Sequence, residues 1–81
     1  MSDGTTVSGL IAGAKQVRRA LDADRVLRLY VADDADPAVT EAAARRCTAA
    51  GIPVERVPTM KRLGARCGLA VGAAVAARVR D

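Results

Sequence analysis

The sequence contains no histidine, phenylalanine or tryptophan, and Tyr30 is its only aromatic residue. Without an imidazole there is no base for a Ser-His or Cys-His nucleophile, so histidine-dependent catalysis is excluded. A histidine-ligated metal site is excluded for the same reason. A single ring also argues against proteins that read single-stranded nucleic acid by stacking successive bases on several aromatic side chains.

Cysteine is scarce as well. Cys47 and Cys67 form no C-x-x-C pair and are too few to hold together a secreted, disulfide-dependent fold. Each falls on the apolar face of an expected helix. We therefore expect two buried free thiols that pack as small hydrophobic side chains, in preference to a redox or metal-binding role.

Long apolar runs are also missing. The longest uncharged stretches, 4–14 and 67–77, are each about half of the roughly 20 residues that span a bilayer. The apolar stretch 7–12 does not make an export signal, because Asp3 is the only charge before Lys15 and Gly9 interrupts the run. We therefore expect a soluble, cytoplasmic protein that makes no membrane contact.

What the chain does contain is a globular composition. Of its 81 residues, 51% are hydrophobic and 27% are charged, which favours one compact domain over residues 1–81. Valine, leucine, isoleucine and 18 alanines must fill its core, so its layers should be thin and closely packed. The net charge of +4 holds across physiological pH because no histidine titrates there.

Helical spacing of apolar residues predicts a first helix over 15–22, entered through Gly13. A second helix is expected over 36–51, because it begins with an Asp-Pro pair suited to an N-cap and first helical position and stops at a glycine. A third, shorter helix is expected over 58–68.

Strands are expected between these helices. Residues 26–32 are nearly continuously apolar, which is typical of a strand covered on both faces, and a short strand follows at 54–57. Strict alternation predicts that much of 69–79 is a strand, while 5–11 is consistent with a helical turn or a short edge strand. This order predicts an α/β fold, a three-layer α/β/α sandwich around a small mixed sheet of about four strands.

Two basic groups stand out near expected helix starts. Phosphate oxygens are plausible ligands there, because backbone N–H groups at a helix N-terminus already favour anions. If the fold brings both starts to one edge, the groups form one electropositive surface; otherwise they are two solvated faces. The groups are Lys15, Arg18 and Arg19, and Lys61, Arg62 and Arg66.

Other constellations have simpler explanations. Asp33, Asp34 and Asp36 follow a buried strand, where a hard cation could bind, but Asp36 has sufficient reason to be there as an N-cap. No phosphate-loop or dinucleotide-binding glycine motif is present. Glycines recur at 64, 68 and 72, and close helix packing, a helix stop and a strand approaching its neighbour account for them.

Four blocks of the chain together resemble one family in their order and spacing. They are Gly13-Ala14-Lys15-Gln16-Val17-Arg18-Arg19-Ala20, Val31-Ala32-Asp33-Asp34-Ala35-Asp36-Pro37, Val57-Pro58-Thr59-Met60-Lys61-Arg62-Leu63-Gly64 and Cys67-Gly68-Leu69-Ala70-Val71-Gly72-Ala73-Ala74. The sequence resembles the ribosomal L-seven-Ae and L-thirty-e family of kink-turn RNA-binding proteins, and its small bacterial members in particular. The resemblance covers residues 13–79.

The resemblance implies a sandwich that grips an RNA kink between a stem with tandem sheared G·A pairs and an internal loop. It implies three groups of site residues. The G·A pairs would be read by Gly13, Ala14, Lys15, Gln16 and Arg19, the loop nucleotides would be contacted by Leu69, Ala70 and Val71, and the phosphate backbone would be contacted by Lys61 and Arg62.

The sequence departs from that family in two places. Archaeal and eukaryotic members have Asn-Glu where this chain has Lys15-Gln16, so an amide and a cation replace a carboxylate. Gln16 can still offer a donor and an acceptor to a base edge. Gly4 and Gly9 interrupt the first helix that the resemblance implies.

We therefore expect a monomeric, non-catalytic protein without a cofactor that binds structured kink-turn RNA, ribosomal RNA being one possibility. The alternative is a protein-interaction module of the same fold whose basic face meets an acidic partner. An enzyme that uses the aspartates at 33–36 is a more distant alternative.

Overall fold

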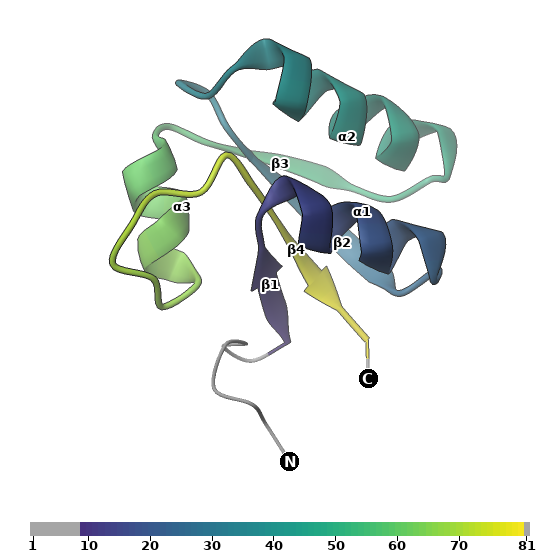
Figure 1. Cartoon of the computed structure of the whole chain (residues 1–81). Coiled ribbons are helices and arrows are strands. Elements are labelled where there is room, and N and C mark those ends of the chain that lie inside the picture. Colours follow the sequence, from purple (N-terminus) through teal and green to yellow (C-terminus); the bar gives the residue numbers. More distant parts are fainter. Residues whose placement is uncertain (1–8, 81) are drawn as a thin grey trace.

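A computed structural model of the chain describes residues 9–80. Helices and strands alternate along the sequence, as the hydrophobic spacing predicts (Figure 1). The elements are β1 (Leu10–Ala12), α1 (Ala14–Asp22), β2 (Val26–Ala32), α2 (Pro37–Ala49), β3 (Val54–Val57), α3 (Met60–Arg66) and β4 (Val75–Val79).

The four strands form one mixed sheet in the order β1-β4-β2-β3. The last strand, β4, lies inside the sheet and pairs antiparallel with both β1 and β2. The β2–β3 pair is parallel, with α2 as its crossover. The register of β2 against β4 shifts between Val26 and Arg28, which marks an irregularity at the start of β2.

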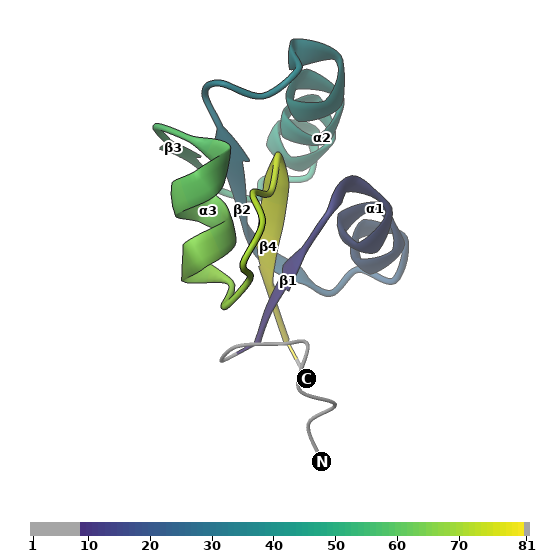
Figure 2. The ribbon, with the colours of Figure 1, turned by 60° about the vertical axis from the view of Figure 1, so that its left-hand side comes forward.

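Helices cover both faces of this sheet, so the predicted three-layer sandwich is confirmed (Figure 2). On one face, Val17 of α1 and Cys47 of α2 pack on Leu29 and other sheet residues. On the other face, Leu63 of α3 packs over Tyr30. Small side chains allow these layers to approach closely, since Ala76 and Ala77 in β4 are fully buried.

The sequence signals account for how α2 begins. The carboxylate of Asp36 accepts a hydrogen bond of 2.9 Å from the N–H of Ala38, and Pro37 occupies the first turn, where its missing N–H costs nothing. At the other end, Gly51 has a φ of +76°, a conformation in which glycine ends helices without steric cost. No helix in residues 9–80 has the length and apolar character needed to cross a bilayer.

Two expectations need correction, and an alternative left open at the start of the chain is partly decided. Only the second half of 69–79 is a strand, because residues 69–74 form a loop that packs on α3 before β4 begins. The strand β2 is buried on both faces only from Leu29 onward, and Leu27 is 44% exposed. Of the stretch 5–11, residues 10 and 11 belong to an edge strand, and 5–8 lie outside the described residues, as does Gly4.

All three helices begin at the same edge of the sheet. Residue Ala12 at the end of β1 pairs with Ala76 near the start of β4, and Val75 pairs with Val31 near the end of β2. Because β3 runs parallel to β2, it ends at this edge too. The starts of α1, α2 and α3 therefore lie at one edge, together with the loop that enters β4.

Candidate functional site

The start of α1 is the part of this edge with the most open backbone. Gly13 has a φ of +103°, its N–H donates to the carbonyl of Val75 at 2.9 Å, and its carbonyl accepts from Val17 at 3.0 Å. No side chain caps the helix, so the N–H groups of its first turn have no side-chain acceptor. Lys15 and Gln16 are exposed beside them.

The other two helices begin differently. A carboxylate caps α2, as described above, and α3 has two acceptors at its start. Thr59 Oγ1 accepts from the N–H of Arg62 at 3.1 Å, and Asp34 Oδ1 accepts from the N–H of Met60 at 2.7 Å. Among the helices described, α1 alone therefore has no side-chain acceptor at its start, which leaves its first N–H groups open to an anion.

The Asp34–Met60 hydrogen bond could not be read from the sequence, because its partners lie 26 positions apart. Thr59 carried a local signal, since a threonine ahead of a helical stretch is a common N-cap. These two residues fix the start of α3 and leave it less suited to an anion than its sequence suggests.

The loop between α3 and β4 is tied to α3 at two points. The N–H of Leu69 donates to the carbonyl of Gly64 at 2.9 Å, and the N–H of Ala73 donates to that of Met60 at 2.9 Å. Gly64 and Gly72 are both needed for the loop to come this close to α3. A Cβ on Gly64 would overlap the carbonyl oxygen of Val71, and one on Gly72 would lie 3.0 Å from the Cβ of Met60.

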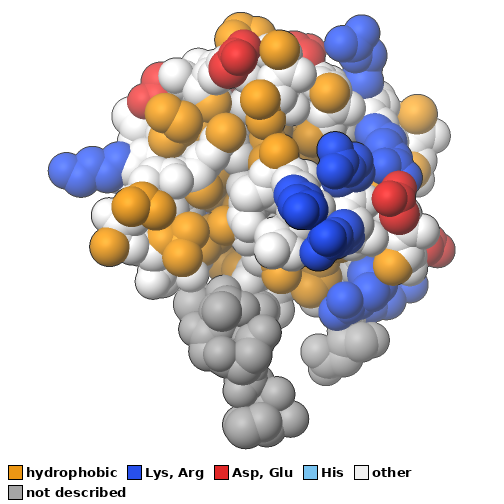
Figure 3. All heavy atoms as spheres, viewed as in Figure 1, with side chains coloured by type: hydrophobic (Ala, Val, Ile, Leu, Met, Phe, Trp, Pro, Cys, Tyr) orange, Lys and Arg blue, Asp and Glu red, His pale blue; other side chains and the backbone are white. Residues whose placement is uncertain are grey.

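Tying the loop to α3 leaves apolar side chains in solvent. Val71 is 69% exposed, and Leu69 and Met60 are each 37% exposed. Ala70 is exposed as well. In Figure 3, hydrophobic side chains gather over α3 and the loop that follows it. The start of α1 is visible in the same view. The family resemblance points to the loop residues but not to Met60, whose helical spacing suggests a core position.

The α1 cations form an open basic surface. Lys15, Arg18 and Arg19 are exposed, and none of them pairs with a carboxylate within residues 9–80. Blue side chains gather over α1 in Figure 3. Asp22 at the end of the helix is bound by Arg46 of α2 at 2.6 Å, so it does not offset these cations.

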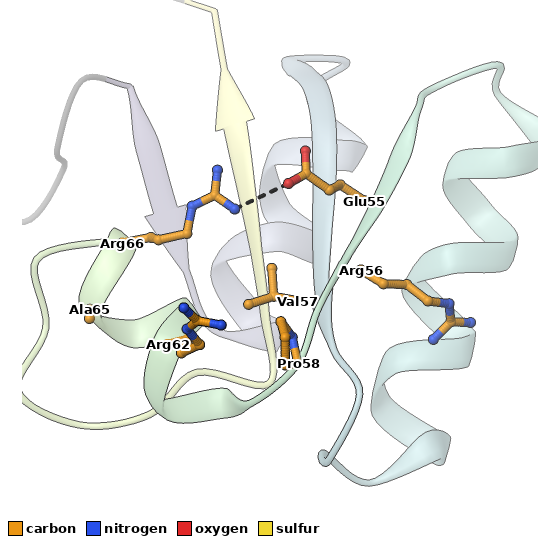
Figure 4. Close-up of a pocket in the computed structure, with 7 residues that line it drawn as sticks. All are labelled: Glu55, Arg56, Val57, Pro58, Arg62, Ala65 and Arg66. Atoms are coloured by element: carbon orange, nitrogen blue, oxygen red, sulfur yellow. Dashed lines mark hydrogen bonds and ion pairs between the residues drawn. The ribbon is translucent and has the colours of Figure 1, made fainter.

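The α3 cations do not join that surface. Although α1 and α3 begin at one edge, they cover opposite faces of the sheet. Arg62 and Arg66 line a hollow beside β3 (Figure 4), and Arg66 pairs with Glu55 at 3.2 Å. Lys61 is exposed. The two basic groups are therefore separate surfaces.

The three aspartates after β2 each have a structural partner. Asp33 pairs with Arg56 at 3.0 Å, Asp34 binds the start of α3, and Asp36 caps α2. Within residues 9–80, no three His, Cys, Asp or Glu side chains gather where they could hold a metal ion. The local role expected for Asp36 is confirmed, and the other two connect neighbouring elements.

Both cysteines are buried free thiols, as expected, and they lie on opposite faces of the sheet. Burial raises the pKa of the Cys47 and Cys67 thiols, against a smaller opposing effect of the neighbouring Arg46 and Arg66. A raised pKa disfavours the thiolate, which is the reactive form. The thiols therefore have the properties of core side chains.

Comparisons with known proteins agree with this structure. Residues 5–81 match the model of the "Ribosomal protein L7Ae/L30e/S12e/Gadd45 family". An RNA-binding protein of Geobacillus sp. (strain WCH70) is 40% identical over 70 residues, which is 86% of this chain and 85% of the relative. An RNA-binding protein of Bacillus pumilus (strain SAFR-032) is 43% identical over 68 residues, covering 84% and 83% of the two chains.

Solved structures show the same fold. The 15.5 kD RNA-binding protein of Giardia lamblia superposes with a TM-score of 0.80 at 22% identity, over 90% of this chain and 62% of that one. A Bacillus halodurans protein described as having unknown function gives a TM-score of 0.77 at 26% identity, over 90% and 72%. The match over nearly the whole sequence places this chain in the ribosomal protein L7Ae/L30e/S12e/Gadd45 family.

Proposed function

We propose that this chain is a non-catalytic RNA-binding protein that recognises kink-turn RNA and associates with the ribosome. Relatives at 40% and 43% identity are named RNA-binding proteins, which supports the class of partner. The observation that carries the proposal is the start of α1, uncapped and held by the Gly13–Val75 hydrogen bond next to an exposed apolar loop.

In this proposal the start of α1 meets the sheared G·A pairs. The open N–H groups and the Lys15 ammonium favour the electronegative side of the RNA, while the Gln16 amide can donate to one base-edge atom and accept from another. Ala14 leaves room for the RNA to approach, and Arg19 follows one turn after Lys15 on the same helix.

The loop after α3 has a different role. Leu69, Ala70 and Val71 would pack against nucleotides of the internal loop, because their exposed apolar surface suits base faces and sugars better than phosphates. The ties to α3 set the position of this surface before RNA binds, so little ordering cost is left at binding.

The remaining cations would contact the phosphate backbone. Arg18 lies on α1, and Lys61, Arg62 and Arg66 lie on α3. Such contacts orient the RNA and supply salt-dependent affinity without reading base identity. Archaeal and eukaryotic members of the family have Asn-Glu where this chain has Lys15-Gln16. The start of α1 therefore lacks a carboxylate here, which lowers its electrostatic repulsion of RNA but also changes which base-edge atoms it can match.

The test compares two RNAs that have the same length and charge. One is a kink-turn with tandem sheared G·A pairs, and in the other those pairs are replaced by Watson–Crick pairs. At about 0.15 M salt, where screening weakens distant charge attraction, the kink-turn should bind at least tenfold more tightly. Equal affinities would leave only general cation–phosphate attraction. They would favour the alternative in which the basic face meets an acidic protein.

A further inference from the structure

A hollow of about 460 Å³ lies between the edge strand β3 and α3. Figure 4 shows Arg62 and Arg66 beside it on α3, facing Val57 at the end of β3 and Pro58 just after it. No residue of α1 and none of the loop before β4 lines it. The hollow is therefore distinct from the surface at the start of α1.

The Arg66 guanidinium is held in place. It pairs with Glu55 at 3.2 Å on one side and lies 4.8 Å from the centroid of the Tyr30 ring. Tyr30 itself is buried, with 4% of its surface exposed, so the ring is a fixed support. An arginine held in this way loses less conformational entropy when it binds an anion than a free one does.

The charge around the hollow is unbalanced. Glu55 lies between two guanidinium groups, because it is also 3.8 Å from Arg28. Arg62 has no carboxylate partner within residues 9–80. Arg28 and Arg66 therefore share one carboxylate, and Arg62 has none in the part of the chain that the structure describes.

Arg56 adds little to this excess. It points away from the hollow in Figure 4, and its guanidinium is 3.0 Å from Asp33 and 3.8 Å from Glu41. Arg56 is thus the one cation of the lining that points away from the hollow, and two carboxylates balance its charge. The uncompensated positive charge belongs to α3 and β2.

We propose that this hollow is a second phosphate-binding site, which holds the RNA backbone at a point outside the kink. The inference rests on the proposed function, because it takes RNA as the partner. Arg62 and Arg66 stand one helical turn apart, a spacing at which two guanidinium forks can share one phosphodiester.

Backbone contact fits the hollow better than base recognition. The hollow offers no exposed ring on which a base could stack, and Val57 and Pro58 supply no side-chain group for a base edge. Since α1 and α3 cover opposite faces of the sheet, RNA held at the start of α1 must continue beyond the kink to reach the hollow. The partner is therefore a kink-turn with an extended stem.

The test measures affinity for a minimal kink-turn and for kink-turns with one stem or the other extended by about ten base pairs. One extension should tighten binding of the unaltered protein. The Arg62→Ala/Arg66→Ala variant should then lose about tenfold in affinity for that long RNA and clearly less for the minimal one. For the long RNA, its plot of log K against log salt should become shallower by about 1 to 2.

Arg45→Ala is the matched control, since Arg45 is an exposed arginine of α2 outside both surfaces, and it should leave the length dependence intact. Equal losses on long and minimal RNA in the double variant would overturn the second site. So would a length dependence that survives the double substitution.

Glu55→Gln tests the site without removing a cation. Releasing Arg66 from its carboxylate should raise affinity for the long RNA about threefold, whereas a merely structural role for Glu55 would leave affinity unchanged or lower it. Failure of the two inferences is distinguishable. If the unaltered protein shows no preference for sheared G·A pairs, the kink-turn proposal is rejected. If neither stem extension tightens its binding, the hollow is rejected as a second site.

Discussion

Gly64 shows how one missing side chain determines a surface. It lies inside α3, where a glycine usually weakens a helix, yet the chain crosses the helix at this point with the carbonyl of Val71 against it. The exposed position of Val71 depends on that crossing, because the loop could not approach α3 over a Cβ. The glycine contributes a shape to the molecule at the cost of some helix stability.

Gly64→Ala should therefore be destabilising although alanine favours helices. The helical gain of roughly 0.5–1 kcal/mol is outweighed by overpacking against the loop, typically about 1–3 kcal/mol. We expect a lower free energy of unfolding in urea and weaker RNA binding. Gly51→Ala is the control, because its cost comes from a φ of +76° in open space; it should lower stability but not RNA affinity.

Gln16→Ala removes the one neutral amide at the start of α1. If the amide makes a bidentate contact to a base edge, the preference for sheared over Watson–Crick RNA should fall by about 1–3 kcal/mol, on the scale of base readout in DNA. Arg66→Ala provides the contrast. If Arg66 contacts only phosphate, its removal should weaken binding of the sheared and the Watson–Crick RNA alike. A loss that falls on only one of these RNAs would show that the contact assignment is wrong.

At the scale of elements, α3 depends on its neighbours. With seven residues it is too short to be stable in isolation, and its first turn is held by Thr59 and by Asp34 from the β2–α2 connection. The same helix supports the apolar loop and lines the hollow. The β2–α2 connection therefore positions two candidate RNA contacts that it does not touch.

Asp34→Ala should loosen α3. Losing a 2.7 Å charge-assisted hydrogen bond to the N–H of Met60 is expected to cost about 1–2 kcal/mol, and hydrogen exchange of the α3 amides should quicken more than that of the α1 amides. Asp33→Ala, which removes only an exposed ion pair, is the control. Equal effects of both substitutions would contradict the capping role.

Most elements could be predicted because their signals are local. The Asp36-Pro37 pair, the apolar run ending at Ala32 and the helical spacing after Gly13 each identify an element. Residues 69–74 were misread as strand because alternation also occurs in a loop that packs one side on a helix. The loop contacts Met60 and Gly64, which lie in α3, so periodicity within 69–79 alone cannot reveal that the loop packs on this helix.

The same reasoning explains what was missed at the site. That Lys15 and Gln16 lie on an open helix start follows from glycine and helical spacing nearby. That Arg66 instead lies on Tyr30 and pairs with Glu55 depends on β2, β3 and α3 meeting in space. Local sequence identified the cations but not the direction in which each one points.

At the scale of the whole molecule, stability depends on two thin cores on opposite faces of the sheet, each containing one thiol. Burial raises the pKa of both thiols above the ordinary value of 9.0. The folded chain therefore keeps these protons at a pH where the unfolded chain has begun to lose them. We therefore expect the contribution of these two thiols to the free energy of unfolding to fall as pH rises above about 9.

This pH dependence can be measured by urea unfolding at pH 8 and pH 10. A variant carrying Cys47→Ala and Cys67→Ala should be less stable at both values, because it leaves small cavities, but its loss between them should be smaller than that of the unaltered chain. An identical loss in both proteins would assign the pH dependence to other groups.

The interior position of β4 has a consequence for biosynthesis. Residues 75–79 join two strands, β1 and β2, that make no pairing with each other, so a nascent chain that still holds this segment inside the exit tunnel can form only the β2–β3 part of the sheet. The Gly13–Val75 hydrogen bond is then also unmade. Competence to bind RNA would be acquired only once this segment has emerged, and until then the nascent chain would not compete for RNA.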